Sequence, residues 1–155
     1  MLLDFYELEK VVNEVKRDNK QIVFVNGCFD LFHMGHLDLL NQAAALADIL
    51  IVGVNSDDSV KTLKGNKRPI ISQLYRSFII DNIRCVDYTT IFDDKTPKAL
   101  IEMIKPDIMI KGEDYKKKTI EEMETIIKQG IDIRYIDNKY NMSTSAIIER
   151  IMKIE

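Results

Sequence analysis

Residues 26–36 read NGCFDLFHMGH and contain both histidines of the 155-residue chain, His33 and His36. The stretch follows QIVFVNG at 21–27, a run of apolar and β-branched residues that is typical of a buried strand. It leads into MGHLDLLNQAAALA at 34–47, where apolar residues recur at helical spacing. The stretch therefore predicts a strand, a tight turn at a glycine and a helix, with both histidines at the start of that helix.

The same alternation of strand and helix continues along the rest of the chain. Buried strands are predicted at 21–27, 48–57, 85–92, 106–112 and 132–137. Helices are predicted at 5–18, 34–47, 57–63, 72–83, 95–105, 117–129 and 143–154. Strands that alternate with helices indicate a parallel sheet covered on both faces. We therefore predict one α/β domain over residues 1–155, a Rossmann-like five-stranded parallel sheet with helices on both faces.

Composition restricts the class of protein. Hydrophobic residues make up 46% of the chain, enough for one core, and the formal net charge is −3. A negative net charge disfavours broad nucleic-acid binding, which depends on many Lys and Arg side chains. Residues 1–10 resemble neither a signal peptide nor a membrane span. We expect a cytoplasmic protein that does not bind membranes, in which Cys28 and Cys85 are reduced thiols.

The position of the opening stretch suggests a ligand. In parallel α/β sheets, ligands bind outside the carboxyl ends of the strands, where the strand order reverses. A helix N-terminus there offers free N–H groups and a partial positive charge to an anion. Residues three apart share a helix face, so both imidazoles are expected at this crevice, and Gly35 between them leaves room for a ligand. A phosphate group is the simplest ligand for this arrangement. The residues expected around it from the strand end are Asn26, Gly27, Cys28 and Phe29.

Other interpretations of the stretch remain open. The two histidines can have a purely structural role at the helix start. A metal site is a sharper alternative, because Cys28, Asp30, His33 and His36 all carry possible ligand atoms. The scarcity of further Cys and His side chains disfavours a closed zinc site, so we predict no metal-ligating residues. Cys28 is expected to be a small turn residue rather than a nucleophile, because no histidine outside this cluster is available as its base.

Two motifs more than a hundred residues apart carry a family resemblance. GCFDLFHMGH at 27–36 resembles the first signature of the H-x-G-H nucleotidyltransferases, the cytidylyltransferase-like family. MSTSAII at 142–148 resembles the second signature, I-S-T-T or C-S-T-T before an apolar helix. Two segments between these motifs resemble the adenylyltransferase domains for D-glycero-β-D-manno-heptose 1-phosphate in lipopolysaccharide synthesis. They are ILIVGVNSDDSVKTLKGNKRPI at 49–70 and CVDYTTIFDDKTPKALIEMIKPDIMIKGEDY at 85–115. The resemblance covers residues 21–151.

The resemblance implies a reaction and a set of roles. A phosphate oxygen of a sugar phosphate attacks the α-phosphorus of ATP in line and pyrophosphate leaves, with Mg²⁺ bridging the phosphates. His33 and His36 would donate hydrogen bonds to the triphosphate, and His36 is expected to stabilise the α-phosphate in the transition state. The remaining phosphate ligands that the resemblance implies are Lys64, Arg76, Ser143 and Thr144. It also implies a possible homodimer.

The nucleoside is expected beside the end of the fourth predicted strand. Lys111, Gly112 and Asp114 would contact it, with Gly112 allowing close approach of the backbone. The family phrase K-G-G-D-Y reads KGEDY here, so Glu113 replaces a glycine beside this site. A carboxylate there favours a base with an exocyclic amino group, but adenine and cytosine both have one, so Glu113 alone does not select between ATP and CTP.

Each phosphate-binding role that the resemblance implies has a purely structural alternative. Lys64 can belong to an ordinary solvated loop, Arg76 can lie along the edge of the core, and Ser143 can be a simple helix cap. Two other functions also remain open. One is a CTP-dependent cytidylyltransferase that acts on glycerol 3-phosphate or a similar small acceptor. The other is a nucleotide-binding module without catalysis.

Overall fold

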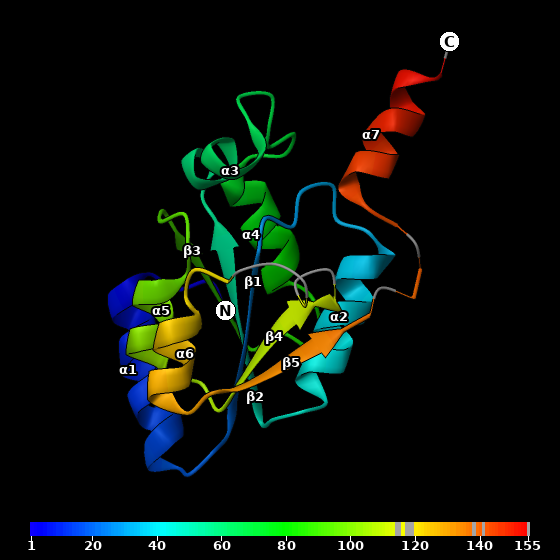
Figure 1. Cartoon of the computed structure of the whole chain (residues 1–155). Helices are drawn as coiled ribbons and strands as arrows, with labels where there is room; N and C mark the ends of the chain where they lie inside the picture. Colours follow the sequence, from blue (N-terminus) through cyan, green and yellow to red (C-terminus); the bar gives the residue numbers. More distant parts are fainter. Residues whose placement is uncertain (114–115, 117–119, 138, 141, 155) are drawn as a thin grey trace.

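Five parallel strands form one sheet in the computed structural model, which describes residues 1–113, 116, 120–137, 139–140 and 142–154 (Figure 1). The strands are β1 (Ile22–Gly27), β2 (Ile49–Asn55), β3 (Tyr88–Phe92), β4 (Ile108–Gly112) and β5 (Asp132–Ile136). Their order is β3-β2-β1-β4-β5, and every neighbouring pair is parallel. This confirms the predicted Rossmann-like fold.

Helices follow the strands as predicted, with some different boundaries. They are α1 (Phe5–Arg17), α2 (Met34–Ala44), α3 (Asp57–Lys64), α4 (Gln73–Asp81), α5 (Lys98–Ile104), α6 (Met123–Gln129) and α7 (Thr144–Met152). The prediction of a helix over 117–129 was wrong for residues 120–122, which precede α6. Ile120 packs into the core there and Glu122 forms a buried ion pair, so this segment is fixed by side-chain contacts instead of helical periodicity.

The apolar side chains of the central strand alternate between two cores. Ile22 and Phe24 of β1 face a core that also contains side chains from α1, α5 and α6. Val23 and Val25 face the opposite core, to which α2 and α4 contribute. All four side chains are at most 1% exposed. The sheet is therefore covered on both faces, and its strands read as continuous apolar runs because both faces are buried.

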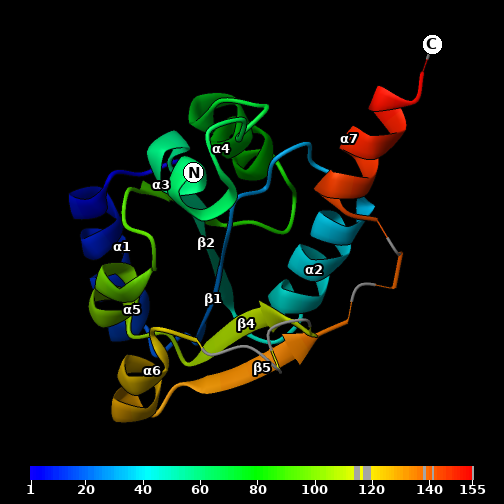
Figure 2. The same cartoon turned by 45° about the horizontal axis from the view of Figure 1, so that its top comes forward.

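The strand order places a crevice at the carboxyl end of β1. From β1 the chain first runs outward through β2 to β3, and it then returns to pair β4 on the other side of β1. The carboxyl ends of β1 and β4 diverge there into different connections, which is the usual ligand position in such sheets. Figures 1 and 2 show the arrowheads of β4 and β5 pointing toward the side of the molecule that carries α2 and α7.

None of the helices within the described residues is sufficiently long and apolar to cross a lipid bilayer.

Candidate active site

A cavity of about 760 Å³ lies at the carboxyl ends of the strands. Its size suits a small-molecule ligand of the nucleotide class. The predicted site residues that line it are Asn26, Gly27, Cys28, Phe29, His33, Gly35, His36, Lys64, Lys111, Gly112, Ser143 and Thr144. Asp114 lies outside the described residues. Both signature motifs thus meet at one cavity, although more than a hundred residues separate them.

His33 is the N-cap of α2. Its Nδ1 accepts a hydrogen bond from the backbone N–H of Gly35 at 3.1 Å. Because Nδ1 is the acceptor, the proton of the neutral imidazole belongs on Nε2, which is then a donor. Burial lowers the pKa of His33 below its ordinary value. The cap therefore fixes the orientation of a neutral imidazole at the edge of the cavity.

His36 stacks on His33 with ring centroids 3.8 Å apart. The ring of Phe29 meets the His36 imidazole edge to face at 5.3 Å, and Phe32 lies on it at 5.6 Å. Burial, together with the neighbouring His33, lowers the pKa of His36 to about 4. Its Nδ1 is buried and has no hydrogen-bond partner among the residues that the structure describes. His36 is consequently neutral at pH 7 and held by aromatic packing.

Asp30 joins three segments around the histidine turn. Its carboxylate accepts hydrogen bonds from Nε of Arg68 at 2.8 Å and from the backbone N–H groups of Ile70 and Ile71, both at 2.9 Å. Its backbone carbonyl accepts from the hydroxyl of Thr144 at 2.8 Å. Burial alone would raise the pKa of Asp30, but the two backbone donors and Arg68 outweigh it and lower that pKa. Asp30 is therefore ionised, and its oxygens accept hydrogen bonds from the loop at 68–71 and from the start of α7.

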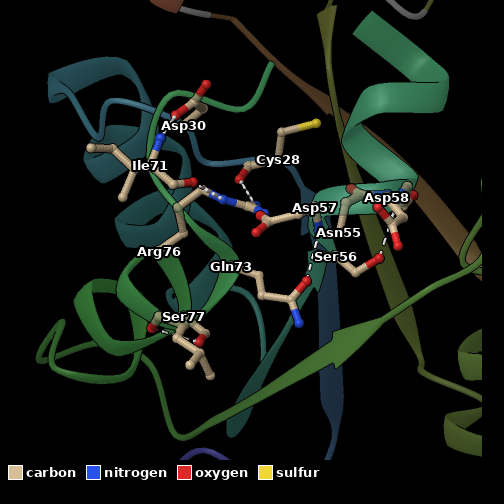
Figure 3. A network of polar contacts seen from close by, with 12 residues as sticks. Cys28, Asp30, Asn55, Ser56, Asp57, Asp58, Ile71, Gln73, Arg76 and Ser77 are labelled. Atoms are coloured by element: carbon tan, nitrogen blue, oxygen red, sulfur yellow. Dashed lines mark hydrogen bonds and ion pairs between the residues drawn. The ribbon is translucent and has the colours of Figure 1, made fainter. Parts of the chain in front are cut away.

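Arg76 does not lie where the family resemblance placed it. Its side chain is fully buried and does not line the cavity. Nε donates to the carbonyl of Ile71 at 2.8 Å, one terminal nitrogen donates to the carbonyl of Cys28, and the other pairs with Asp57 at 2.8 Å (Figure 3). The expectation that Arg76 holds phosphate oxygens is thus corrected, because its guanidinium is committed to the turn after β1 and to the start of α3.

Two cations lie at one side of the cavity. Lys64 ends α3 and is exposed, so its side chain both lines the cavity and contacts solvent. Arg68 also lines the cavity and was missed by the sequence analysis. Its position in the KGNKRP loop, four residues after Lys64, could have indicated that Arg68 also lies at the phosphate site. Arg68 is paired with the buried Asp30 carboxylate at 2.8 Å, so of the two cations Lys64 is the one whose charge Asp30 does not offset.

The N-terminus of α7 forms another part of the cavity wall. Ser143 is the N-cap and accepts a hydrogen bond from the N–H of Ala146 at 3.1 Å, so its interpretation as a helix cap is correct. Capping leaves other N–H groups of the first turn without helical partners. Thr144 and Ser145 line the cavity beside the cap. This end of α7 can therefore bind an anion as well as being capped.

Lys111 and Glu122 form a buried ion pair in the cavity. Nζ of Lys111 donates to the Glu122 carboxylate at 2.6 Å and to the side-chain oxygen of Asn26 at 3.0 Å. The two charged side chains are 7% and 6% exposed. The bond to Asn26 connects the ends of β1 and β4, the strands between which the order reverses. Glu122 was given no role from the sequence, where it falls within the helix predicted over 117–129.

Two further polar side chains at the cavity, those of Glu113 and Cys28, also have shifted pKa values. Glu113 lines the cavity and pairs with Lys116 at 2.6 Å, which lowers the pKa of the Glu113 carboxyl. Burial raises the pKa of the Cys28 thiol, which makes it a poor nucleophile at pH 7. Among the described residues, no group of three or more His, Cys, Asp or Glu side chains is arranged to hold a metal ion.

Comparison with known families agrees with this geometry. The family model described as cytidylyltransferase-like matches residues 24–150, which include both motifs at the cavity. The chain belongs to the cytidylyltransferase-like family.

Individual relatives of this cytidylyltransferase-like chain are longer proteins. It is 47% identical over 146 residues to the bifunctional protein HldE of Helicobacter pylori strain J99, covering 94% of this chain and 31% of that protein. It is also 47% identical over 147 residues to the bifunctional protein HldE of a Nitratiruptor species, covering 95% of this chain and again 31% of that protein. The chain thus spans about a third of the length of these curated relatives.

A solved structure shares the fold of this family member. The lipopolysaccharide core biosynthesis protein from Thermoplasma volcanium GSS1 superposes with a TM-score of 0.61 at 28% sequence identity. The match covers 77% of this chain and 97% of that one.

The low pKa of His36 makes stability depend on pH. The folded-state value is about 4, against 6.5 for an ordinary histidine, so the unfolded chain binds this proton first as the pH falls. We expect the His36 contribution to the free energy of unfolding to decrease by about 3 kcal/mol as the pH drops from 6.5 to 4. Urea unfolding across this range measures it, and His36→Gln should flatten the curve. An unchanged pH dependence in His36→Gln would contradict the assignment.

Proposed function

We propose that this chain transfers AMP from ATP to the phosphate of a sugar phosphate, heptose 1-phosphate, to form ADP-heptose and pyrophosphate. The observation that carries the proposal is the pair of oriented, neutral imidazoles of His33 and His36 at the start of α2, in one cavity with Lys64 and the capped end of α7. Family membership supports nucleotidyl transfer. The heptose acceptor is supported by the resemblance of residues 49–70 and 85–115 and by the structural neighbour in lipopolysaccharide core biosynthesis.

The proposed chemistry is a direct displacement. An oxygen of the sugar phosphate forms a bond to the α-phosphorus of ATP, the bond to the β-phosphate bridging oxygen breaks, and pyrophosphate leaves with that electron pair. No covalent intermediate on the protein is required. Catalysis then consists of positioning the reactants and stabilising charge on the transferring group. The side chains around the cavity supply hydrogen-bond donors rather than a nucleophile.

His33 and His36 are proposed to donate to phosphate oxygens, with His36 at the α-phosphate. Neutral imidazoles do not repel each other when stacked at 3.8 Å, which allows both to approach one group. A bound triphosphate is an opposite charge nearby and therefore raises the pKa of both histidines. Because two charged rings at 3.8 Å repel each other, nucleotide binding favours at most one protonated imidazole of the pair.

The other phosphates are proposed to lie between two structural elements. Lys64 and Arg68 supply cations from one side, and Ser143 and Thr144 lie at the start of α7 on the other. Asp30 bonds both to Arg68 and to Thr144, so it links the loop that carries Arg68 to the start of α7. The nucleoside is proposed to lie against Lys111 and Gly112, together with Asp114.

A pyrophosphate-release assay with paired substrates tests the proposal. ATP with heptose 1-phosphate is expected to give the highest kcat/KM, and CTP with glycerol 3-phosphate to be poor, because a site that pairs one base edge leaves its polar groups unpaired with another. A preference for CTP with glycerol 3-phosphate would overturn the substrate assignment and favour the cytidylyltransferase alternative. No pyrophosphate with any pair, despite nucleotide binding, would favour the non-catalytic module.

Mg²⁺ is proposed as part of the substrate, bound to the triphosphate as MgATP. Hard divalent cations bind phosphate oxygens and neutralise their charge. We expect EDTA to abolish pyrophosphate release and added Mg²⁺ to restore it, with no stoichiometric zinc in the purified protein by elemental analysis. Stoichiometric zinc that disappears together with activity in His33→Ala would instead favour the metal-site interpretation.

The resemblance and composition support three further proposals. We propose that residues 1–155 act as one nucleotidyltransferase domain, that the chain works in the cytoplasm without binding nucleic acid or membranes, and that it forms a homodimer. Light scattering at several protein concentrations measures the last of these.

A further inference from the structure

Helix α7 is not held in place by burial in an apolar core. The structure describes the whole of α7, and none of its residues is buried. Neither core formed by the described residues includes a side chain from this helix. Figures 1 and 2 both show α7 extending away from the sheet toward the C-terminus. Apolar packing therefore does little to keep the start of α7 at the cavity, and the polar contacts of its first turn become important.

Thr144 makes such a contact. Its hydroxyl donates to the backbone carbonyl of Asp30 at 2.8 Å, which joins residues 114 positions apart in the chain. A hydroxyl has one proton to donate. While Thr144 gives that proton to a carbonyl, it has none for a phosphate oxygen, which is itself an acceptor. The hydroxyl is thus committed to the protein, and the groups of α7 that remain for phosphate are backbone N–H groups of the first turn.

The carbonyl at the other end of this bond belongs to a strained turn. Phe29 and Leu31, on either side of Asp30, have positive φ values of 50° and 46°. Such values are uncommon for non-glycine residues and persist where surrounding contacts hold the backbone. The Asp30 side chain is 0% exposed, and its carboxylate accepts hydrogen bonds from the loop at 68–71. The bond from α7 therefore attaches this helix to the held turn that leads into His33.

We propose that Thr144 is a positioning residue, whose hydroxyl fastens the start of α7 to the histidine turn. The inference rests on the proposed function, because this is the site assigned to the triphosphate. The bond to Asp30 takes the place of the direct phosphate contact that the family resemblance implies for the Thr144 side chain. Without this bond, the first turn of α7 leaves the cavity more often. A bound triphosphate then loses backbone donors, while His33 and His36 stay in place.

Thr144→Val tests the proposal, because it keeps the branched shape and removes the hydroxyl. In pyrophosphate-release assays with ATP and heptose 1-phosphate, kcat/KM should fall roughly tenfold, the upper end of the range for one neutral hydrogen bond. In the ligand-free protein, hydrogen exchange of the amides at 146–152 should be roughly fivefold faster, because α7 opens more readily. Thr144→Ser keeps the hydroxyl and should restore both quantities to within about twofold of the wild type.

The two measurements separate positioning from its alternatives. If the Thr144 hydroxyl were a direct phosphate ligand, Thr144→Val would lower kcat/KM and leave exchange in the ligand-free protein unchanged. If the bond to Asp30 were purely structural, the same variant would speed exchange and leave kcat/KM unchanged. Either result would overturn the proposal, and so would no change in both quantities or a failure of Thr144→Ser to restore them.

Thr62→Val is the matched control. The Thr62 hydroxyl also donates to a backbone carbonyl, that of Asp58 at 3.0 Å, but this bond lies within the single helix α3. Thr62 is exposed and does not line the cavity. We expect its replacement to leave kcat/KM within about twofold of the wild type and exchange in α7 unchanged. Equal losses of kcat/KM in Thr62→Val and Thr144→Val would contradict the proposal.

Failure of the inference and failure of the proposed function give different results. If the wild type releases pyrophosphate and the Thr144 variants do not behave as described, the inference alone is wrong. If the wild type releases none with any substrate pair, the proposed function fails and the positioning role in catalysis fails with it. Circular dichroism identifies a variant that does not fold. If Thr144→Val is that variant, Thr144→Ala replaces it, and unchanged exchange or unchanged kcat/KM in Thr144→Ala overturns the inference.

Discussion

We expect His36→Ala to lower kcat by roughly 100-fold or more while the fold persists. This is the scale expected when one preorganised donor to transition-state charge is removed. The imidazole is packed between Phe29, Phe32 and His33, so its position is fixed before substrate binds. Steady-state kinetics with ATP and heptose 1-phosphate measure the effect. It should appear in kcat more than in KM, because the donor acts on charge that develops in the transition state.

Met34→Ala is the matched control for this result. Met34 is in the first turn of the same helix and its side chain is 43% exposed, but it does not line the cavity. Because Met34 does not line the cavity, its replacement should leave kcat within about twofold of the wild type, and because it is exposed the free energy of unfolding should change by less than about 0.5 kcal/mol. Near-normal turnover in His36→Ala would contradict the proposed mechanism.

We expect Arg76→Met to destabilise the protein by about 3–5 kcal/mol, the range for breaking a buried charge network by removing one partner. The substitution leaves the carbonyls of Cys28 and Ile71 without their donor and Asp57 without its cation. Urea unfolding measures the loss. Because Arg76 touches the turn that leads to His33, activity should also decrease at temperatures where the variant remains folded.

Arg84→Met controls for the loss of an arginine in general. Arg84 is exposed, and its replacement should change the free energy of unfolding by no more than about 0.5 kcal/mol. A change of less than about 1 kcal/mol in Arg76→Met would contradict the structural role assigned to that residue.

Local patterns were sufficient to predict the five strands, the crevice and the starts of α1 and α2, but not the start of α6. The apolar run at 21–27 and the helical pattern after it place His33 and His36 at the start of a helix beside the crevice, as observed, whereas the N-cap role of His33 was not predicted. The serine at 143 was identified as a cap for the same reason, since caps are set by nearest neighbours along the chain.

Long-range polar contacts were not predictable from those patterns. Arg76 bonds to Cys28, 48 positions away, and to Asp57, 19 positions away. A helical pattern gives no sign of such partners. Glu122 falls within the helix predicted over 117–129, and nothing in that pattern marks it as buried. Its partner Lys111 lies in β4, 11 positions earlier, a spacing that helical periodicity does not pair. Buried polar pairs of this kind depend on topology, which periodicity alone does not specify.

The most direct test of the central claim is to identify the product formed from MgATP and heptose 1-phosphate. Mass spectrometry of the reaction with the wild-type chain should show ADP-heptose, with an equal amount of pyrophosphate, and His36→Ala should form both far more slowly. Pyrophosphate without a nucleotide sugar, or no product despite measurable ATP binding, would contradict the proposal that His33 and His36 direct adenylyl transfer to a sugar phosphate.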